Sequence, residues 1–393
     1  MNILMFSEDP QALVAGSGTQ ERMREYAEAV GQLHIIVRAQ NPRQMQASEG
    51  LFLYPVASRS VLGYIRAWRR GAMLCRAHRF DAISVQAPTV FGYIGFYLSR
   101  RFHIPLQLQL HTDYMSPHYR QAGWKERAHY HLARFLIPRA DCVRAVSRRI
   151  TNNLYLAKQG TKQGKGKNGC TLLSKVQNKI SVLPIFTDAL KFLDARLDTA
   201  TERRFADYDF KMIAVGRFVD KEKNFSMLID VMRLFVRICP QALLVIVGDG
   251  PDRNYYKLQI TNYKLEKNII IEPWRDDLPS FFKSFDLFLL SSNYEGWGRA
   301  VIEAMAAGLP VVMTDTGLAG EVVKTQENGI VVPVGDLQAF LDAIKNLYED
   351  PIGRLQIARE GQETSKNLKP QTKKEYLARW RESFVSCRRN GYP

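Results

Sequence analysis

The chain lacks the sequence features of a membrane-spanning or disulfide-stabilised protein. No segment approaches the ~18 consecutive apolar residues that a transmembrane helix needs. The first residues, MNILMFS, predict a strand and lack a basic stretch followed by an apolar core, so we expect no signal peptide. The five cysteines are scattered and form no C-x-x-C pair: Cys75, Cys142, Cys170, Cys239 and Cys387. Their pattern predicts reduced thiols in a cytoplasmic protein, with neither a disulfide nor a zinc site.

Acidic residues are scarce relative to basic ones. The 39 Asp and Glu face 55 Lys and Arg, and the net charge of +16 requires an anionic partner. Between Glu49 and Asp81 there is no acid, but there are six arginines: Arg59, Arg66, Arg69, Arg70, Arg76 and Arg79. Five apolar residues there share one helical face: Val61, Ile65, Trp68, Ala72 and Cys75. Such a helix packs on a sheet or lies on an anionic bilayer, and a second basic aromatic stretch at 119–139 favours peripheral membrane contact.

The C-terminal half contains a strand, a turn, a short helix and a further strand. Phe285–Leu290 is a short apolar run bounded by turn residues, which predicts a buried strand. Arg299–Ala307 consists of good helix formers and is followed by Gly308, which predicts a short helix with a glycine stop. Leu309–Met313 is expected to form the next strand.

Glu295 and Glu303 flank the start of this helix. On one continuous helix, carboxylates eight positions apart would be separated by about 12 Å along the axis. Gly296 and Gly298 allow the backbone to fold back before the helix begins, so both carboxylates can face one crevice at the carboxyl end of a strand. Helix N–H groups favour a phosphate there and carboxylates accept sugar hydroxyls, which suits a nucleotide sugar.

The same residues match a known signature. The pattern EGFG-x3-EAMA-x-G-x-PVV is present from Glu295 through Glu303, Gly308 and Pro310, with Trp297 in place of the usual Phe. On these residues the chain resembles the retaining glycosyltransferases of the GT-B architecture, specifically glycosyltransferase family 4, also called glycosyl transferases group 1, with its E-x7-E motif.

This resemblance implies a GT-B fold of class α/β, with two Rossmann-like doubly wound domains facing an interdomain cleft. The length of 393 residues suits two domains. We expect an N-terminal acceptor-binding domain over residues 1–186 and a C-terminal domain, which binds the nucleotide-sugar donor, over residues 187–372. A helix at Lys373–Arg389 is expected to lead residues 373–393 back onto the first domain.

The resemblance also implies the donor-binding residues. In the family the first Glu of the motif contacts hydroxyls of the donor sugar and the second holds the ribose, which assigns these roles to Glu295 and Glu303. Gly298 and Arg299 lie inside the motif and are expected to belong to the same donor site.

Arg217 and Lys223 follow a predicted strand at 211–215 and correspond to the Arg and Lys that hold the diphosphate in the family. Cleavage of a sugar–phosphate bond builds negative charge on the leaving nucleoside diphosphate, and fixed cations stabilise that charge. We therefore expect both residues to act in catalysis as well as in donor binding. The glycines Gly248 and Gly250, after the next strand, are expected to be structural.

Two residues of the N-terminal half are also site predictions. Gly18 lies in the turn before the first helix, where the family has adjacent glycines, and is expected near the diphosphate or acceptor. His111 ends the strand Pro105–Leu110, and the family has a His there beside the donor sugar. The resemblance implies retaining transfer without a protein nucleophile, in which the donor phosphate helps to deprotonate the acceptor. The sequence offers no carboxylate base.

We expect neither a cofactor nor an obligatory metal. Asp207, Tyr208 and Asp209 form a D-x-D, but this lies before its strand and away from the predicted crevice, so we interpret it as a solvated loop. Lys158–Lys179 contains six lysines in a Gly- and Gln-rich stretch, which predicts a solvated surface insertion.

The sequence therefore predicts a retaining hexosyltransferase. Its donor would be a UDP- or GDP-sugar and its acceptor a glycan or lipid-linked intermediate in cell-envelope polysaccharide or glycolipid synthesis. We expect a cytoplasmic protein, peripheral on the inner face of the membrane. Two alternatives stay open. One is a nucleotide-sugar epimerase or phosphorylase on the same fold. The other is a basic nucleic-acid-binding protein, which charge alone favours because no reading module is present.

Overall fold

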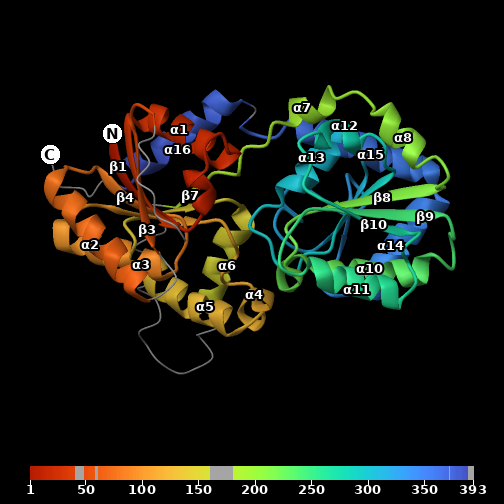
Figure 1. Cartoon of the computed structure of the whole chain (residues 1–393), viewed down its shortest axis with the longest axis horizontal. Coiled ribbons are helices and arrows are strands. Elements are labelled where there is room, and N and C mark those ends of the chain that lie inside the picture. The colour runs from red at the N-terminus through yellow and green to blue at the C-terminus, as the bar shows by residue number, and fades with distance from the viewer. Residues whose placement is uncertain (40–47, 58–60, 160–179, 371, 388–393) are drawn as a thin grey trace. The chain divides into compact units, whose positions relative to one another are not determined.

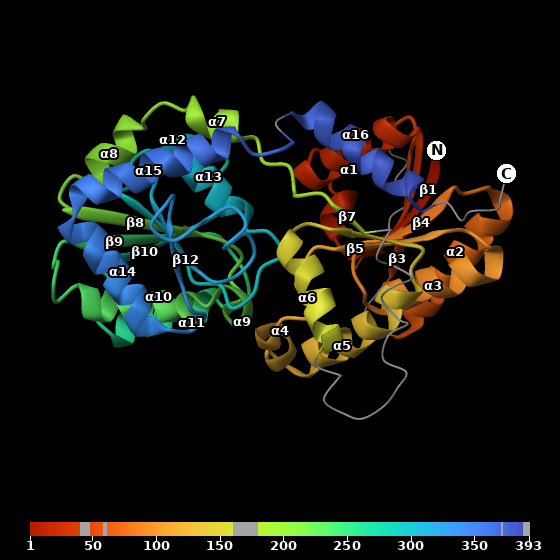
Figure 2. The same ribbon diagram turned by 180° about the vertical axis from the view of Figure 1, so that it is seen from behind.

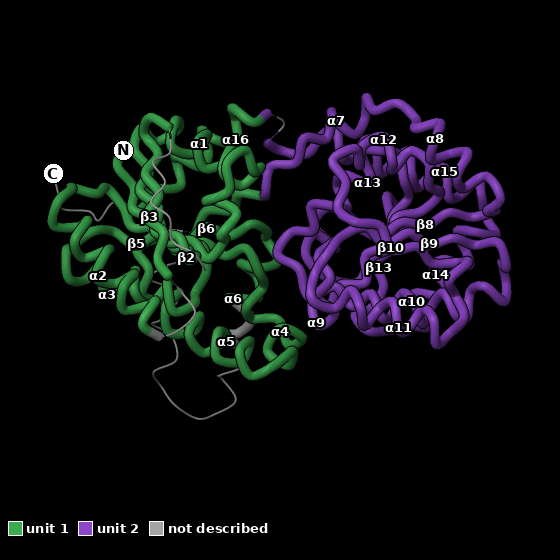
Figure 3. The backbone as a smooth tube through the Cα atoms, in the orientation of Figure 1, with its two compact units in different colours: residues 1–184, 373–393 green, residues 185–372 purple. Residues whose placement is uncertain are grey.

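The computed structural model describes residues 1–39, 48–57, 61–159, 180–370 and 372–387. The chain divides into two compact units, residues 1–184 with 373–393 and residues 185–372 (Figure 3). The division falls between Pro184 and Ile185, two residues before the predicted boundary. Each unit is built on one parallel sheet with helices on both faces, so the predicted α/β class with two doubly wound domains is confirmed (Figure 1).

Unit 1 contains, among its described residues, a seven-stranded parallel sheet in the order β3-β2-β1-β4-β5-β6-β7. Its strands are β1 (Asn2–Ser7), β2 (Gln32–Ala39), β3 (Leu51–Ala57), β4 (Ala82–Val85), β5 (Leu106–Leu110), β6 (Cys142–Ala145) and β7 (Ile180–Val182). Its α-helices are α1 (Gly18–Val30), α2 (Val61–Ala77), α3 (Val90–Phe102), α4 (Pro117–Gln121), α5 (Trp124–Leu136), α6 (Arg148–Gln159) and α16 (Lys373–Val385), and its 3-10 turns are η1 (Pro10–Leu13) and η2 (Ile137–Arg139). Helices α1 and α16 cover one face of this sheet, and α2 and α3 cover the other (Figures 1 and 2).

Unit 2 contains, in its described part, a six-stranded parallel sheet in the order β10-β9-β8-β11-β12-β13. Its strands are β8 (Phe210–Val215), β9 (Ala242–Val247), β10 (Ile269–Glu272), β11 (Leu287–Leu290), β12 (Val311–Thr314) and β13 (Ile330–Val332). Its helices are α7 (Ala189–Leu193), α8 (Thr199–Arg204), α9 (Asp220–Lys223), α10 (Phe225–Phe235), α11 (Arg253–Asn262), α12 (Leu278–Phe282), α13 (Arg299–Ala307), α14 (Leu337–Glu349) and α15 (Pro351–Lys366).

The strands of unit 2 are nearly continuous apolar runs because helices cover both faces of a parallel sheet. The β9 sequence ALLVIV is buried at every position. On one face, Phe235 of α10, Tyr256 of α11 and Phe340 of α14 complete a hydrophobic core with these strands. Helices α12, α13 and α15 lie on the opposite face (Figures 1 and 2). Helices therefore cover both faces of the sheet, and the loops at its carboxyl edge extend from this packed core.

The C-terminal helix α16 packs on unit 1, as the sequence predicts. Its Trp380 ring stacks on Tyr26 of α1 with 4.2 Å between the ring centroids. The side-chain nitrogen of Gln107 in β5 donates a 3.1 Å hydrogen bond to the carbonyl oxygen of Ser383. Buried aromatic and polar contacts thus fix this helix against α1 and the sheet.

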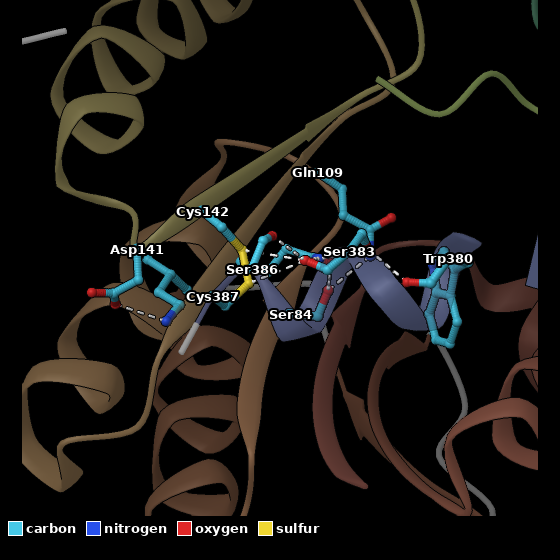
Figure 4. Close-up of a disulfide and its surroundings, with 10 residues drawn as sticks. Ser84, Gln109, Asp141, Cys142, Trp380, Ser383, Ser386 and Cys387 are labelled. Atoms are coloured by element: carbon cyan, nitrogen blue, oxygen red, sulfur yellow. Dashed lines mark hydrogen bonds between the residues drawn. A yellow bond between two sulfur atoms is a disulfide. The ribbon is translucent and has the colours of Figure 1, made fainter. Parts of the chain in front are cut away.

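A disulfide joins Cys142 of β6 to Cys387, just beyond α16 (Figure 4). The Cα atoms of this pair are 4.9 Å apart, within the usual range for a disulfide. The prediction that all five cysteines are reduced is therefore wrong for these two. Their separation of 245 positions concealed the pair, because only the return of α16 to unit 1 brings them together. Cys75 and Cys239 are free thiols, and Cys170 lies outside the described residues.

Within the described residues, no helix combines the length and apolar character needed to cross a bilayer. The predicted Lys-rich insertion falls largely on residues 160–179, which lie outside the described residues.

Candidate functional site

The strand order of unit 2 reverses between β8 and β11. The chain proceeds from β8 outward to β9 and β10, and then returns to the other side of β8 as β11. In open parallel sheets, ligands bind beyond the carboxyl ends of the strands at such a switch point. Gly216 and Arg217 follow β8 there, and Ser291 and Ser292 follow β11.

The short helix α9 is fixed to the loop after β11 by hydrogen bonds to its main-chain carbonyl oxygens. Ser291 Oγ donates to the carbonyl oxygen of Lys223 at 2.7 Å. The backbone N–H of Asn293 donates to the carbonyl oxygen of Glu222 at 2.8 Å. Asn224 ends α9 with a left-handed φ of 51°, a conformation that Asn tolerates better than most residues. The position of Lys223 is thus set by the neighbouring loop.

Lys223 forms a hydrogen-bonded ion pair with Glu295. The two side chains are only 15% and 10% exposed, and Ser292 Oγ donates a further 2.8 Å hydrogen bond to the same Glu295 oxygen. Burial acts to lower the pKa of Lys223, but the carboxylates of Glu295 and Glu222 outweigh it and raise this pKa above its ordinary value. Lys223 is therefore a permanently charged cation in a poorly solvated place.

Glu222 is a second acid beside the same cations. Its Oε2 atom lies 2.7 Å from Arg217 Nη2, and its Oε1 atom lies 3.6 Å from Lys223 Nζ. Arg217 is 66% exposed, so its guanidinium can leave Glu222 at little cost. Both residues predicted to hold a diphosphate are thus near one another, and carboxylates of the chain itself neutralise them.

The turn that carries Glu295 depends on close backbone approach. Gly298 precedes α13 with a left-handed φ of 94°. Gly317 also has a left-handed φ, of 53°, and a Cβ there would lie 2.5 Å from the carbonyl oxygen of Trp297 and 2.9 Å from the Cβ of Glu295. The sequence predicts that Gly296 and Gly298 both fold the backbone back, but Gly296 has no positive φ. Gly298 and the distant Gly317 do this instead.

Glu303 lies one turn into α13 and is buried. Its Oε1 atom lies 2.8 Å from Arg299 Nε, and the two side chains form an ion pair across one turn of the helix. Burial raises the pKa of Glu303, although the positive charges of Arg299 and Lys191 oppose that shift. The predicted donor residues Glu303, Arg299 and Gly298 therefore lie together at the start of α13, and each glutamate of the motif has its own cation.

The predicted residues His111 and Gly18 belong to unit 1. His111 follows β5, and its Nε2 lies 3.1 Å from the side-chain oxygen of Gln109. Burial, followed by the guanidinium groups of Arg144 and Arg22, lowers the pKa of His111 to about 3, so its ring is neutral at pH 7. Gly18 is the first residue of α1, and a Cβ there would meet no atom within 4 Å.

No metal-binding group is found among the described residues. No cluster of three or more His, Cys, Asp or Glu side chains there is arranged to hold an ion. The D-x-D segment precedes β8 at the edge opposite the site, and the backbone N–H of Asp209 donates to the carbonyl oxygen of Gln241. Gly248 is structural as predicted, because a Cβ there would collide with the carbonyl oxygen of Gly216.

Family models match both units. The model described as glycosyl transferases group 1 matches residues 199–364, and the model described as a glycosyl transferase 4-like domain matches residues 15–161. The two matches together support a GT-B glycosyltransferase of the family 4 type. Both family matches lie within the boundaries of the structural units, and the GT-B resemblance inferred from the E-x7-E segment is confirmed at the level of family and fold.

Curated relatives and solved structures agree with this assignment. The chain is 32% identical over 171 residues to the lipopolysaccharide core biosynthesis glycosyltransferase LpsE of Rhizobium meliloti, covering 43% of this chain and 47% of that protein. It is 28% identical over 180 residues to an Escherichia coli galactosyltransferase named for UDP-Gal and GlcNAc-diphosphoundecaprenol, covering 44% and 46%. The chain thus spans about half the length of these two relatives. The structure of Anabaena HepE with UDP-glucose superposes with a TM-score of 0.70 at 20% identity, covering 98% of this chain and 99% of that one.

Sequence reasoning missed three residues that shape this site. Glu222 directly precedes Lys223 in the sequence, but it was not among the predicted site residues. Ser292 follows the predicted strand and was not a predicted site residue, whereas its hydroxyl donates to Glu295. Gly317 carries the weakest signal, because its contact with the Glu295 turn joins segments that are separate in the sequence.

Proposed function

We propose that this protein is a retaining glycosyltransferase that moves a hexose from a nucleotide diphosphate sugar to a glycan or lipid-linked acceptor, in cell-envelope polysaccharide or glycolipid synthesis. The observation that carries this proposal is the buried Lys223–Glu295 pair, with Arg217 beside it, beyond the carboxyl ends of β8 and β11. A site with two cations and a hydroxyl-accepting carboxylate suits a sugar attached to a diphosphate.

Donor binding would exchange the partners of these cations. The diphosphate replaces Glu222 beside Arg217 and Lys223, because a doubly charged group offers more oxygens to both cations than one carboxylate does. Glu295, freed from Lys223, accepts hydrogen bonds from hydroxyls of the donor sugar. Glu303 and the first turn of α13 hold the ribose, with Gly298 and Arg299 beside them. As the sugar–phosphate bond breaks, Lys223 stabilises the charge on the leaving diphosphate.

His111 would contribute as a neutral hydrogen-bonding group. Its lowered pKa leaves the ring uncharged at pH 7, so it can bond a sugar hydroxyl without adding a positive charge. In the retaining reaction the donor phosphate takes the proton of the acceptor hydroxyl, and no protein nucleophile or obligatory metal is required. We assign Gly18 a role at the start of α1, where the absence of a side chain lets the diphosphate or the acceptor come close to the backbone.

The relatives support the substrate classes. One match is named for lipopolysaccharide core biosynthesis, another for a UDP-sugar and a lipid-linked acceptor, and a structural neighbour was solved with UDP-glucose. Two of these names favour a UDP-sugar as the donor here, and the proposal also includes a GDP-sugar. A lipid-linked acceptor resides in a bilayer, so the proposal includes peripheral contact with an anionic membrane at its cytoplasmic face.

A thermal-shift screen tests the proposal. Unfolding is followed with UDP, GDP, ADP and their common sugar conjugates for the wild type, Glu303→Ala and the matched control Glu360→Ala, which removes an exposed carboxylate of α15. A ligand at 100 times its Kd adds about 2.7 kcal/mol of stability. We expect one base to shift the wild type and the control but not Glu303→Ala. If no nucleotide shifts the wild type, the donor assignment is wrong.

The product then tests the reaction. With the donor that gives the shift, NMR of the glycoside reports whether the anomeric configuration of the donor is kept. Retention is expected. Inversion contradicts the mechanism, and conversion of the donor without any glycoside points to an epimerase or phosphorylase.

A further inference from the structure

Helices α2, α3 and α5 form the outer layer of unit 1 on the face opposite α1 and α16. They lie side by side in both views, in orange to yellow (Figures 1 and 2). Large apolar side chains stand exposed on all three: Leu62, Ile65, Trp68 and Met73 on α2, Val90, Tyr93 and Tyr97 on α3, and Trp124 and Phe135 on α5. We call these residues, with the exposed arginines between them, the outer-helix surface.

The outward side of α2 is apolar as well as basic. Residues 62, 65, 66, 69 and 73 fall within an arc of about 100° around the helix axis. Leu62 is 58% exposed and Met73 is 47% exposed, and Arg66 and Arg69 are exposed between them. The side that packs inward is built from small residues instead: a Cβ on Gly71 would lie 2.6 Å from a methyl group of Leu98.

This arrangement corrects the helical face expected from the sequence. That face contained Val61, Ile65, Trp68, Ala72 and Cys75, and packing of it on the sheet was the simpler interpretation. Ala72 is buried, but Ile65 and Trp68 are exposed. Packing on the sheet therefore leaves these two large side chains uncovered.

Aromatic and arginine side chains connect the three helices. The Trp68 ring on α2 meets Tyr97 on α3 at 6.2 Å between centroids, and Tyr93 on α3 meets Phe135 on α5 at 6.3 Å. The Arg139 guanidinium lies 4.0 Å from the Phe135 ring centroid. The exposed apolar and basic side chains of the three helices thus form one continuous surface.

The charge of this region is almost entirely positive. From residue 50 to residue 140 the sequence has three acids, Asp81, Asp113 and Glu126, and two of these, Asp113 and Glu126, are buried. Asp81 accepts a hydrogen bond from the backbone N–H of Asn2, at the amino end of β1. The segment from residue 50 to residue 140 has thirteen Lys and Arg: Arg59, Arg66, Arg69, Arg70, Arg76, Arg79, Arg100, Arg101, Arg120, Lys125, Arg127, Arg134 and Arg139.

We propose that the outer-helix surface binds an anionic phospholipid bilayer. Its arginines meet lipid phosphates, its Tyr and Trp rings lie at the level of the headgroups, and Leu62, Ile65 and Met73 enter the boundary of the acyl chains. The proposal deepens the proposed function by naming the face that would bring the enzyme to a lipid-linked acceptor, but the binding itself requires no nucleotide.

The exposed aliphatic side chains favour a bilayer over a nucleic acid. A nucleic acid attracts the arginines and stacks on aromatic rings. It offers little to Leu62, Ile65 or Met73, whereas acyl chains remove these side chains from water. Of these two partners, only a lipid surface uses both the charge and the apolar exposure of this helical arc.

Vesicle co-sedimentation tests this inference on the full chain. The vesicles are pure phosphatidylcholine, or phosphatidylcholine in which about a third of the lipid is phosphatidylglycerol. The variants are Arg69→Glu and the pair Ile65→Ser with Met73→Ser. The matched controls, Arg359→Glu and Ile352→Ser, change an exposed arginine and an exposed isoleucine on α15 of unit 2. Circular dichroism shows whether each variant is folded.

The wild type should bind the anionic vesicles and not the neutral ones. Raising the salt from about 0.1 M to about 1 M should weaken binding, because the Debye length falls from roughly 10 Å to 3 Å. Arg69→Glu should lower the partition coefficient about fivefold or more, and the double serine variant about tenfold. Both unit 2 controls should bind as the wild type does.

Three results would overturn the inference. The first is absence of binding to anionic vesicles, and the second is an equal loss of vesicle binding in the unit 2 controls. The third is binding of an oligonucleotide that Arg69→Glu abolishes but that neither the double serine substitution nor competition by vesicles reduces. Failure of the proposed function would appear separately, as a chain that binds vesicles but is shifted by no nucleotide.

Discussion

Replacing Lys223 by Met should affect stability and catalysis by different amounts. Methionine keeps most of the apolar stem and removes the charge, so Glu295 is left as a buried carboxylate whose remaining hydrogen bond comes from Ser292. Breaking a buried ion pair on one side costs about 3 to 5 kcal/mol. Because Ser292 still donates and both side chains are slightly exposed, we expect the lower end, about 3 kcal/mol.

The loss of stability converts to a fall in Tm of roughly 6 to 12 °C for a unit of this size. The catalytic loss has another origin. Lys223 gives a charge-assisted hydrogen bond to the leaving diphosphate, worth about 1.5 to 3 kcal/mol. Its removal should lower kcat roughly 10- to 150-fold at a temperature where the variant is folded.

Thermal unfolding and initial rates with the preferred donor measure the two effects. The double variant Lys223→Met with Glu295→Gln removes the unpaired charge, so it should recover much of the lost Tm while kcat stays low. Lys223→Arg, which keeps the charge, is the control for a change of size alone. The reasoning is refuted if Lys223→Met unfolds at the wild-type temperature, or if the double variant is no more stable than the single one.

Three further predictions concern other site residues. Burial raises the pKa of Glu303, so the stability of the folded chain falls as pH rises from about 4.3, the unfolded value, through the raised folded value. Glu303→Gln should flatten this part of the curve and be more stable than wild type at pH 7, although it binds nucleotide more weakly. Gly317→Ala should lower the free energy of unfolding by about 1 to 2 kcal/mol because of its left-handed backbone. The added Cβ would also press on the Cβ of Glu295, which should lower stability further and reduce kcat. The pKa of His111 is lowered to about 3, so stability should fall as pH drops from about 6.5 towards 3, by at most about 3 kcal/mol between pH 7 and pH 4, and His111→Gln should remove that part of the fall.

Urea unfolding at a series of pH values checks Glu303→Gln and His111→Gln, and wild-type and variant curves that run parallel would contradict both. Gly320→Ala is the control for Gly317→Ala, because Gly320 also has a positive φ, 75°, but a Cβ there meets no atom within 4 Å. Equal losses of kcat in the two alanine variants would show that Gly317 does not support the Glu295 turn.

Elements with strong local signals were predictable from the sequence. The helix at Arg299–Ala307 has the predicted bounds, because its helix formers and the glycine stop at Gly308 act within one or two turns. The preceding strand begins at Leu287 rather than Phe285, although the backbone N–H of Asp286 already donates to the carbonyl oxygen of Lys211 in β8. The division into two units and the return of α16 were also predicted, from length and family resemblance.

The identities of the site residues came from the sequence, but their partners did not. Lys223 and Glu295 are 72 positions apart, and they pair because β8 and β11 lie next to each other in the sheet. Glu222 was not a predicted site residue, whereas the fold puts its carboxylate between Arg217 and Lys223.

The sequence by itself determined the family, the alternation of strands and helices, and the residue types of the donor site, because these depend on local spacing and on motifs. Only the tertiary structure decided the disulfide between Cys142 and Cys387, the support of Glu295 by Gly317, and the exposed face of α2. Each of these depends on which segments become neighbours, and that is settled by strand order and helix packing over separations that no local pattern encodes.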